Sequence, residues 1–128
     1  IIKNIKIIMK YELSHALSAL KPGAQWVCRG EVFSGIEWLD ENQSAPTELE
    51  INNKIAELNA AEPMRLLRVE RDKRISETDW RALPDLTMSD DWKTYRQALR
   101  DLPASATPKL DSNFNLDLTS VTWPTEPS

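Results

Sequence analysis

The 128-residue chain is poor in the residues that build disulfides, metal centres and phosphate-binding loops. It has one cysteine, Cys28, one histidine, His15, and three glycines. A lone cysteine excludes an internal disulfide, and a lone histidine beside it excludes the usual zinc clusters. Three scattered glycines cannot form a glycine-rich phosphate loop. This composition fits a reducing cytoplasm.

Long apolar runs and excess positive charge are also missing. No segment approaches the ~20 apolar residues that a membrane helix needs. The net charge of −4 argues against general nucleic-acid binding, which needs a basic surface. We therefore expect neither a membrane nor a nucleic acid as partner. Five tryptophans are present, and each indole is large enough to organise a small core.

The first ten residues, IIKNIKIIMK, lack the long apolar stretch and the cleavage site of a signal peptide. We interpret residues 1–10 as a non-native or disordered extension. In this interpretation Met9 is the natural start and residues 1–8 are translated upstream sequence. The alternative is a short N-terminal strand or arm, because isoleucine-rich runs favour strands. Thermal unfolding of a chain without residues 1–8 separates the two, since only a real strand would lower the midpoint when removed.

Residues 11–45 predict a helix plus β-hairpin module. Apolar residues recur at helical spacing through residues 11–21, and a Pro-Gly pair at 22–23 ends the run. β-prone patches around Trp26 and Trp38 then indicate a β-hairpin. Because two strands alone are marginal in water, their tryptophan faces must pack on the preceding or the following helix.

A connecting helix is expected over residues 46–62. Thr47 and Glu50 have the spacing of a capping box, in which each side chain binds the backbone amide of the other residue. Proline inside a helix costs ~3 kcal/mol but almost nothing in the first turn. We therefore predict a kink or break near Ala60–Pro63, with Pro63 at the start of a new helix that runs to about Ser76.

Residues 63–103 predict a helical hairpin. Its second helix should begin after the N-cap Ser89 and end at Pro103. The expected hairpin core is Trp80, Leu83, Trp92, Tyr95 and Leu99. Trp92→Ala should cost about 3–5 kcal/mol if the indole is buried. Residues 104–128 should form an extended tail, which Trp123 anchors to the rest of the fold. The predicted fold class is thus α+β and mainly helical.

Tests for catalytic chemistry give no candidate site. Serines flank His15, but only Glu12 is placed near enough to complete a relay, so a partly exposed helix histidine explains the pattern better. Cys28 follows Val27 in a predicted strand and suits a small buried hydrophobe. The acidic residues match no calcium-loop spacing. We predict no enzyme activity, no catalytic or metal-binding residues and no cofactor.

The strongest charged feature is the segment 65–74, with a net charge of +3. Arg65, Arg68 and Arg71 recur every three residues and should form one basic stripe on a helix. One interpretation is a solvated face with internal ion pairs. The other is a partner-binding patch that meets an acidic stretch of another protein, and salt should weaken such a complex.

The second half of the chain also carries a family pattern. Its pieces are Met64-Arg65 with Leu67-Arg68, Arg71-Asp72, Thr78-Asp79-Trp80, Leu83-Pro84-Asp85, Trp92 with the run from Tyr95 to Asp101, and a closing Trp123-Pro124. This pattern, over roughly residues 64–127, resembles the C-terminal module of phage tail assembly chaperone proteins. The first half is similar to small structural or assembly proteins of tailed phages. That similarity rests on Leu20, Pro22, Ala24, Trp26, Gly35, Trp38 to Asp40, Pro46 to Glu48 and Glu50-Ile51.

The resemblance implies an assembly factor that binds a phage tail or tail-fibre protein and promotes its folding or incorporation. It would then act in the host cytoplasm during phage assembly. The alternative is a permanent virion component, such as a tail or fibre adaptor. Both need only a binding surface, so the sequence does not separate them.

Overall fold

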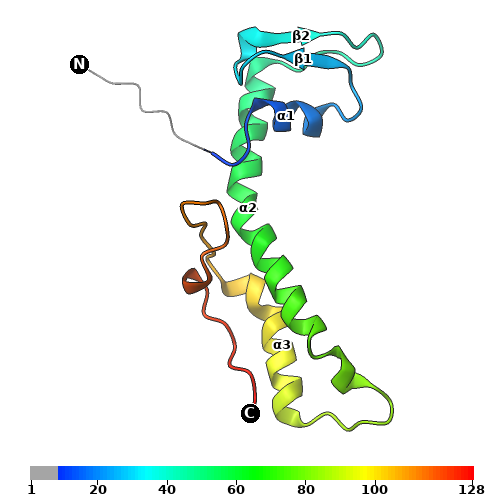
Figure 1. Ribbon diagram of the computed structural model, residues 1–128, viewed down its shortest axis with the longest axis vertical. Coiled ribbons are helices and arrows are strands. Elements are labelled where there is room, and N and C mark those ends of the chain that lie inside the picture. The colour runs from blue at the N-terminus through cyan, green and yellow to red at the C-terminus, as the bar shows by residue number, and fades with distance from the viewer. Residues whose placement is uncertain (1–8) are drawn as a thin grey trace, which may run out of the picture. The chain divides into compact units, whose positions relative to one another are not determined.

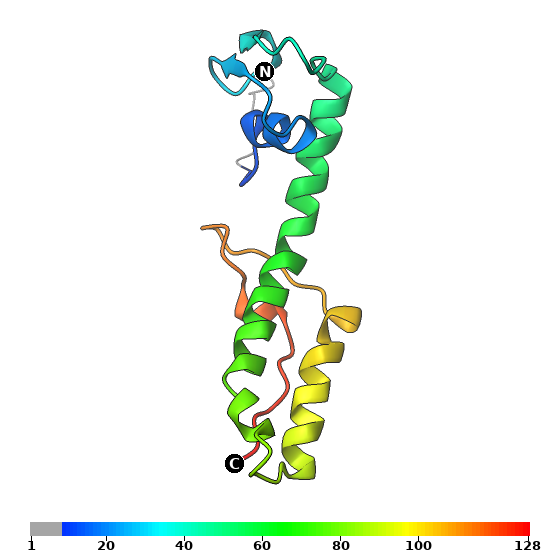
Figure 2. The same ribbon diagram turned by 90° about the vertical axis from the view of Figure 1, so that its right-hand side faces the viewer.

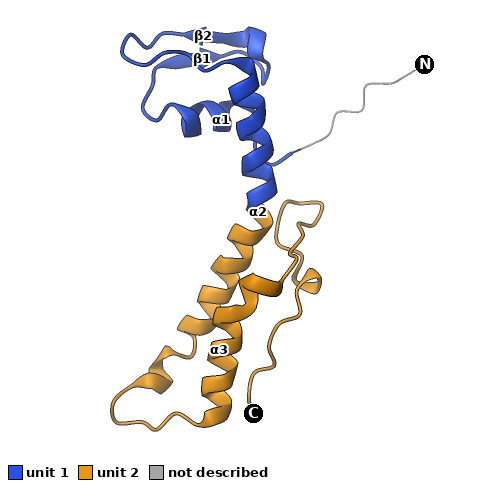
Figure 3. Ribbon diagram, turned by 180° about the vertical axis from the view of Figure 1, so that it is seen from behind, with its two compact units in different colours: residues 1–61 blue, residues 62–128 orange. Residues whose placement is uncertain are grey.

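The computed structural model describes residues 9–128, and the expectations for residues 1–8 lie outside that range. The elements in chain order are α1 (Leu13–Leu20), β1 (Trp26–Cys28), η1 (Phe33–Gly35), β2 (Ile36–Trp38), α2 (Glu48–Ser76), η2 (Asp79–Ala82), α3 (Asp90–Ser105) and η3 (Leu118–Ser120). The fold is α+β and mainly helical, as predicted. The chain divides into unit 1, Ile1–Ala61, and unit 2, Glu62–Ser128 (Figure 3).

The β-hairpin of unit 1 is the one that the sequence predicts. β1 and β2 are antiparallel, and Trp26 lies opposite Trp38 in the register. The connection folds back tightly at Gly35, where an added Cβ would lie 2.0 Å from the carbonyl oxygen of Arg29. Only glycine fits at this position, and the Arg29 amide donates to the Gly35 carbonyl at 2.9 Å.

The core of unit 1 joins the hairpin to two helices. Leu13 and Leu17 of α1 are buried together with Ile51 of α2, and one face of the hairpin packs against them. Figure 1 shows the hairpin and α1 beside the N-terminal part of α2. The prediction that Trp26 and Trp38 pack on helices is confirmed, and both neighbouring helices take part.

Helix α2 begins as predicted but does not break. The Thr47 amide and the Glu50 carboxylate pair at 3.4 Å, and the Glu50 amide donates to the Thr47 hydroxyl at 3.1 Å, which confirms the capping box. The prediction of a helix break near Pro63 is wrong, because one helix runs from Glu48 to Ser76 with Pro63 inside it. Buried apolar side chains on either side of the proline offset the lost hydrogen bond.

Helix α3 begins where the sequence predicts and ends slightly later. The Ser89 hydroxyl accepts from the Trp92 amide at 3.4 Å, which confirms the N-cap. The predicted end at Pro103 is wrong by two residues, since α3 continues to Ser105. In the last turn a proline removes only one helical hydrogen bond, and the Ala106 amide closes the helix on the Leu102 carbonyl at 3.0 Å.

The core of unit 2 is formed by α2, α3 and the C-terminal segment. Leu67, Leu102 and Val121 are buried together, and Trp123 packs against them. The Trp123 indole donates to the Leu118 carbonyl at 3.1 Å, so the predicted docking of this residue is confirmed. Figure 2 shows α3 beside the C-terminal part of α2, with the last residues of the chain following them.

Candidate protein-binding site

The loop between α2 and α3 is held at its start by a buried arginine. Arg96 of α3 is 8% exposed, and its Nη1 lies 2.6 Å from the Thr78 hydroxyl and 3.0 Å from the Asp79 carboxylate. The same nitrogen approaches the Ile75 carbonyl at 3.3 Å, and the Thr78 hydroxyl donates to that carbonyl at 2.7 Å. The Ile75 carbonyl, in the last turn of α2, therefore has hydrogen-bond partners although the helix has ended.

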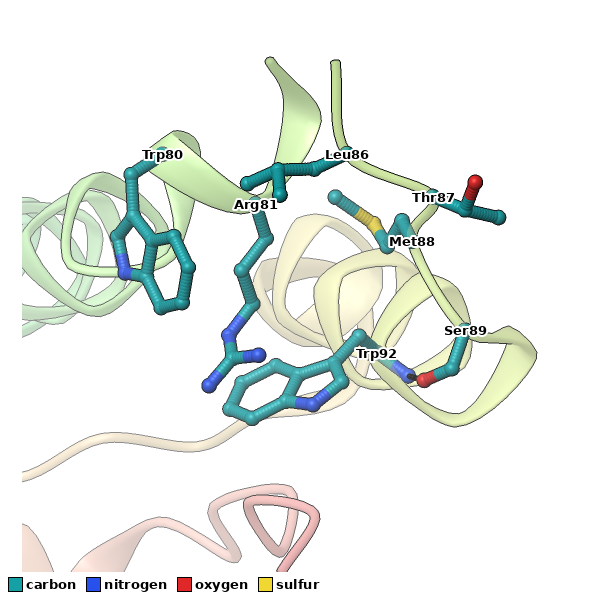
Figure 4. Close-up of a pocket in the computed structure, with 7 residues that line it drawn as sticks. All are labelled: Trp80, Arg81, Leu86, Thr87, Met88, Ser89 and Trp92. Atoms are coloured by element: carbon teal, nitrogen blue, oxygen red, sulfur yellow. Dashed lines mark hydrogen bonds between the residues drawn. The ribbon is translucent and has the colours of Figure 1, made fainter. Parts of the chain in front are cut away.

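Beyond this anchor, an arginine lies between two tryptophans. The Arg81 guanidinium carbon is 4.4 Å from the centre of the Trp80 ring and 3.6 Å from that of Trp92 (Figure 4). Such distances allow cation–π attraction, which fixes the arginine and both indoles relative to each other. Trp92 also meets Tyr95 edge to face, with ring centres 5.7 Å apart. The loop is thus tied to α3 at two points.

A pocket of about 250 Å³ opens beside this stack. Its lining residues are Trp80, Arg81, Leu86, Thr87, Met88, Ser89 and Trp92, as Figure 4 shows. Trp80, Leu83 and Leu86 are 53%, 49% and 45% exposed. The loop is held in place and yet exposes large apolar side chains to water. Exposed apolar surface of this kind is a feature of protein-binding sites.

Two predicted core residues are not in the core. Trp80 and Leu83 are exposed, so their assignment to the hairpin core is wrong. Trp80 lies in the short 3₁₀ turn η2 and Leu83 directly follows it, so both belong to the loop and not to a packed helix face. Tyr95 and Leu99 are buried on α3, while Trp92 is half-buried. Burial raises the pKa of Tyr95 above its usual value, and nearby Glu126 acts in the same direction.

The three arginines of the predicted basic stripe have different surroundings. Arg65 forms an ion pair with the buried carboxylate of Glu62. Arg71 lies 2.8 Å from the Asp72 carboxylate and donates to the Arg100 carbonyl at 3.3 Å. Arg68 is exposed, and no ion pair or side-chain hydrogen bond joins it to another of the described residues. Only Arg68 can therefore be reversed in charge without disturbing a contact of the fold.

The residues tested for chemistry have structural partners. His15 accepts from the Glu12 amide at 3.0 Å and thereby caps α1. Cys28 packs against the core of unit 1. Backbone amides of Gln25, Gln43 and Asn42 hold the pKa of Asp40 below its usual value. Within residues 9–128, no three or more side chains are grouped so that they could hold a metal ion.

Sequence reasoning missed the roles of Arg81 and Arg96. From the sequence alone, Arg96 would be explained by its place toward the C-terminal half of its helix, where the helix dipole favours cations. A signal was present, because Arg96 follows Trp92 by four residues and precedes Leu99 by three, on the apolar side of the helix. Arg81 has no comparable signal, since its contact with Trp92 depends on how the loop folds.

The anchored loop between α2 and α3 presents exposed apolar side chains. The family described as phage tail assembly chaperone protein matches residues 64–128, which include α3, the loop and the C-terminal segment. The chain belongs to this family, and its role is in phage tail assembly. No curated protein and no solved structure matches the chain. No helix within residues 9–128 is long and apolar enough to cross a membrane.

Proposed function

We propose that this protein binds a tail or tail-fibre structural protein in the host cytoplasm and promotes its folding or incorporation into the virion. The observation that carries the proposal is the anchored loop, in which Trp80, Leu83 and Leu86 remain exposed. The matched family supplies the process, tail assembly, and the loop lies within the matched residues. A partner that covers these side chains would remove apolar surface from water, which is the usual driving force of association.

Arg68 marks a second surface, on α2. An exposed cation that pairs with none of residues 9–128 can meet an acidic stretch of the same partner protein, and its contribution should fall as salt is added. The effect of a single exposed charge is small, so the loop should contribute most of the affinity. The acidic net charge argues against a nucleic acid as the primary partner.

The test is co-purification from infected cells with the tagged full-length chain. Replacing Leu83 and Leu86 by serine should remove the tail protein from the recovered material. Leu49, in unit 1, is 70% exposed, so Leu49→Ser is a matched control that should leave recovery unchanged. These exposed substitutions should alter stability by under ~0.5 kcal/mol each. Recovery of tail protein by the loop variant at the parent level would contradict the proposed site.

The same material separates an assembly factor from a permanent virion component. We expect the protein to be absent from purified particles, because a factor that acts during assembly leaves before maturation. Mass spectrometry of purified virions checks this. If this protein were detected in virions at a fixed ratio to the tail proteins, it would be a permanent tail or fibre adaptor and not an assembly factor.

A further inference from the structure

Arg81 differs from most arginines of unit 2 in its partners. Arg65, Arg71, Arg74 and Arg96 each lie within ion-pair distance of a carboxylate. Among the described residues, no carboxylate pairs with Arg81 and no acceptor takes a hydrogen bond from its guanidinium. Its close neighbours are instead the Trp80 and Trp92 rings, at 4.4 and 3.6 Å.

This arrangement fixes the cation without using its hydrogen-bond donors. A guanidinium next to an aromatic ring interacts through its face, while its N–H groups lie in its own plane. The two indoles therefore limit the rotation of the Arg81 head group and leave its donors available. A planar donor fork of this kind matches the two oxygens of a carboxylate, and little side-chain freedom remains to be lost on binding.

The walls of the neighbouring pocket are mainly apolar. Leu86, Met88 and the Trp80 ring line it together with the Arg81 side chain (Figure 4). A volume of about 250 Å³ accommodates one large side chain. The site thus combines a donor fork with an apolar recess, and the matching ligand has a carboxylate next to an apolar side chain.

The charges around the pocket limit how acidic that ligand can be. Asp85, Asp90 and Asp91 are exposed near its lining residues in the chain. Lys93 pairs with Asp90 at 4.0 Å, so Arg81 and Lys93 together do not balance the three carboxylates. A run of acidic residues would be repelled by these carboxylates, whereas a single carboxylate can reach the fork.

From these observations we infer that the Arg81 pocket binds a segment of the virion partner in which one aspartate or glutamate lies beside a large apolar residue. The carboxylate accepts from the Arg81 guanidinium, and the apolar side chain fills the recess between Trp80, Leu86 and Met88. This inference rests on the proposed function and gives the chemistry of the partner at the same site.

The experiment uses the tail protein recovered with the wild-type chain, purified, and short overlapping peptides that cover its sequence. Calorimetric titration measures their affinity for the full-length parent and for Arg81→Lys, which keeps the charge but loses the planar fork. We expect Arg81→Lys to weaken peptide binding about tenfold or more, because the variant loses a charge-assisted hydrogen bond to the peptide carboxylate. Arg29→Lys is the matched control, because Arg29 is an exposed arginine of unit 1 that pairs with Glu37, and this variant should bind the same peptide as the parent does.

The partner side gives an independent arm that does not depend on the folding of this chain. In the peptide that binds, changing its acidic residue to the corresponding amide should cause the same loss as Arg81→Lys. Combining both changes should add little, because they remove one interaction. Full affinity of the amide peptide, or of Arg81→Lys, would overturn the inference. The proposed function would still stand in that case if the variant with serine at Leu83 and Leu86 failed to recover the tail protein. If the parent chain recovered no tail protein, both the proposed function and this inference would be overturned.

Discussion

The two units use tryptophan in different ways. In unit 1, Trp26 and Trp38 lie opposite each other across the hairpin and pack against the buried leucines of α1. In unit 2, every tryptophan lies near an arginine, since Arg81 contacts Trp80 and Trp92 and Arg74 lies 4.1 Å from the centre of the Trp123 ring. The indoles of unit 1 therefore pack on its core without an arginine, whereas each indole of unit 2 stacks with an arginine, and Trp123 also packs on the core.

This difference follows from what each unit has to cover. A two-stranded sheet is too small to be stable alone, so its large side chains must be buried against helices. Two packed helices already form a core from aliphatic residues, here Leu67 and Leu102 with Val121. The indoles of unit 2 are then available for a loop and a C-terminal segment, where arginine stacking supplies order that burial does not.

The largest effect should come from removing a tryptophan of unit 1. Trp38→Ala should lower the free energy of unfolding by about 3 kcal/mol, because the ring packs on the core and its Nε1 donates to the Gln43 carbonyl at 2.8 Å. Trp80→Ala, at a 53% exposed position, should change it by under ~0.5 kcal/mol. Denaturant unfolding followed by circular dichroism measures both. Equal losses of unfolding free energy in the two variants would contradict the difference between the tryptophans of the two units.

The second largest effect on stability should come from Arg96, the buried cation of unit 2. Arg96→Ala should cost about 2 kcal/mol, because charge-assisted hydrogen bonds to Thr78 and Asp79 are lost together. Arg68→Ala, on the exposed face of α2, should be nearly neutral. Hydrogen exchange should also show faster exchange of the amides after Ile75 in the Arg96 variant. Unchanged exchange there would mean that Arg96 does not hold the loop.

Trp92→Ala should have an intermediate effect. The half-buried indole contacts Arg81 and Tyr95 but is not part of the unit 2 core. We expect a loss of about 1–2 kcal/mol, below the ~3–5 kcal/mol for a fully buried ring. Denaturant unfolding followed by circular dichroism measures this loss as well. A loss as large as that of Trp38→Ala would show that the tryptophans of the two units are equivalent in stability.

The smallest expected effect is on stability at acidic pH, and it should be similar in the two units. Backbone amides hold the pKa of Asp40 below its usual value in unit 1, and Thr119 does the same for the pKa of Asp117 in unit 2. A lowered pKa stabilises the fold above about pH 4, and this contribution is lost as the pH falls further. Asp40→Asn and Asp117→Asn should therefore each reduce the drop in melting midpoint between neutral and acidic pH. A drop equal to that of the parent would exclude a role for the residue concerned.

Local signals in the sequence predict the elements well and the tertiary contacts less well. The capping box at Thr47, the N-cap at Ser89 and the paired strands depend on neighbouring residues, and all three are confirmed. The break at Pro63 is not found, because its cost is weighed against packing that the local pattern does not contain. Arg81 meets Trp92, 11 positions away, and Arg96 meets the Ile75 carbonyl, 21 positions away, so no short motif shows which partners these arginines take.

The exposure of Trp80 has a practical consequence for studying this protein. The emission of an indole shifts to shorter wavelength when water around it is replaced by apolar groups. Trp26 and Trp38 pack against the core of unit 1, so a ligand in the Arg81 pocket should leave their emission unchanged. Trp80 lines that pocket and is half in water. The chain therefore carries its own optical reporter of occupancy, and no added dye is needed to follow binding.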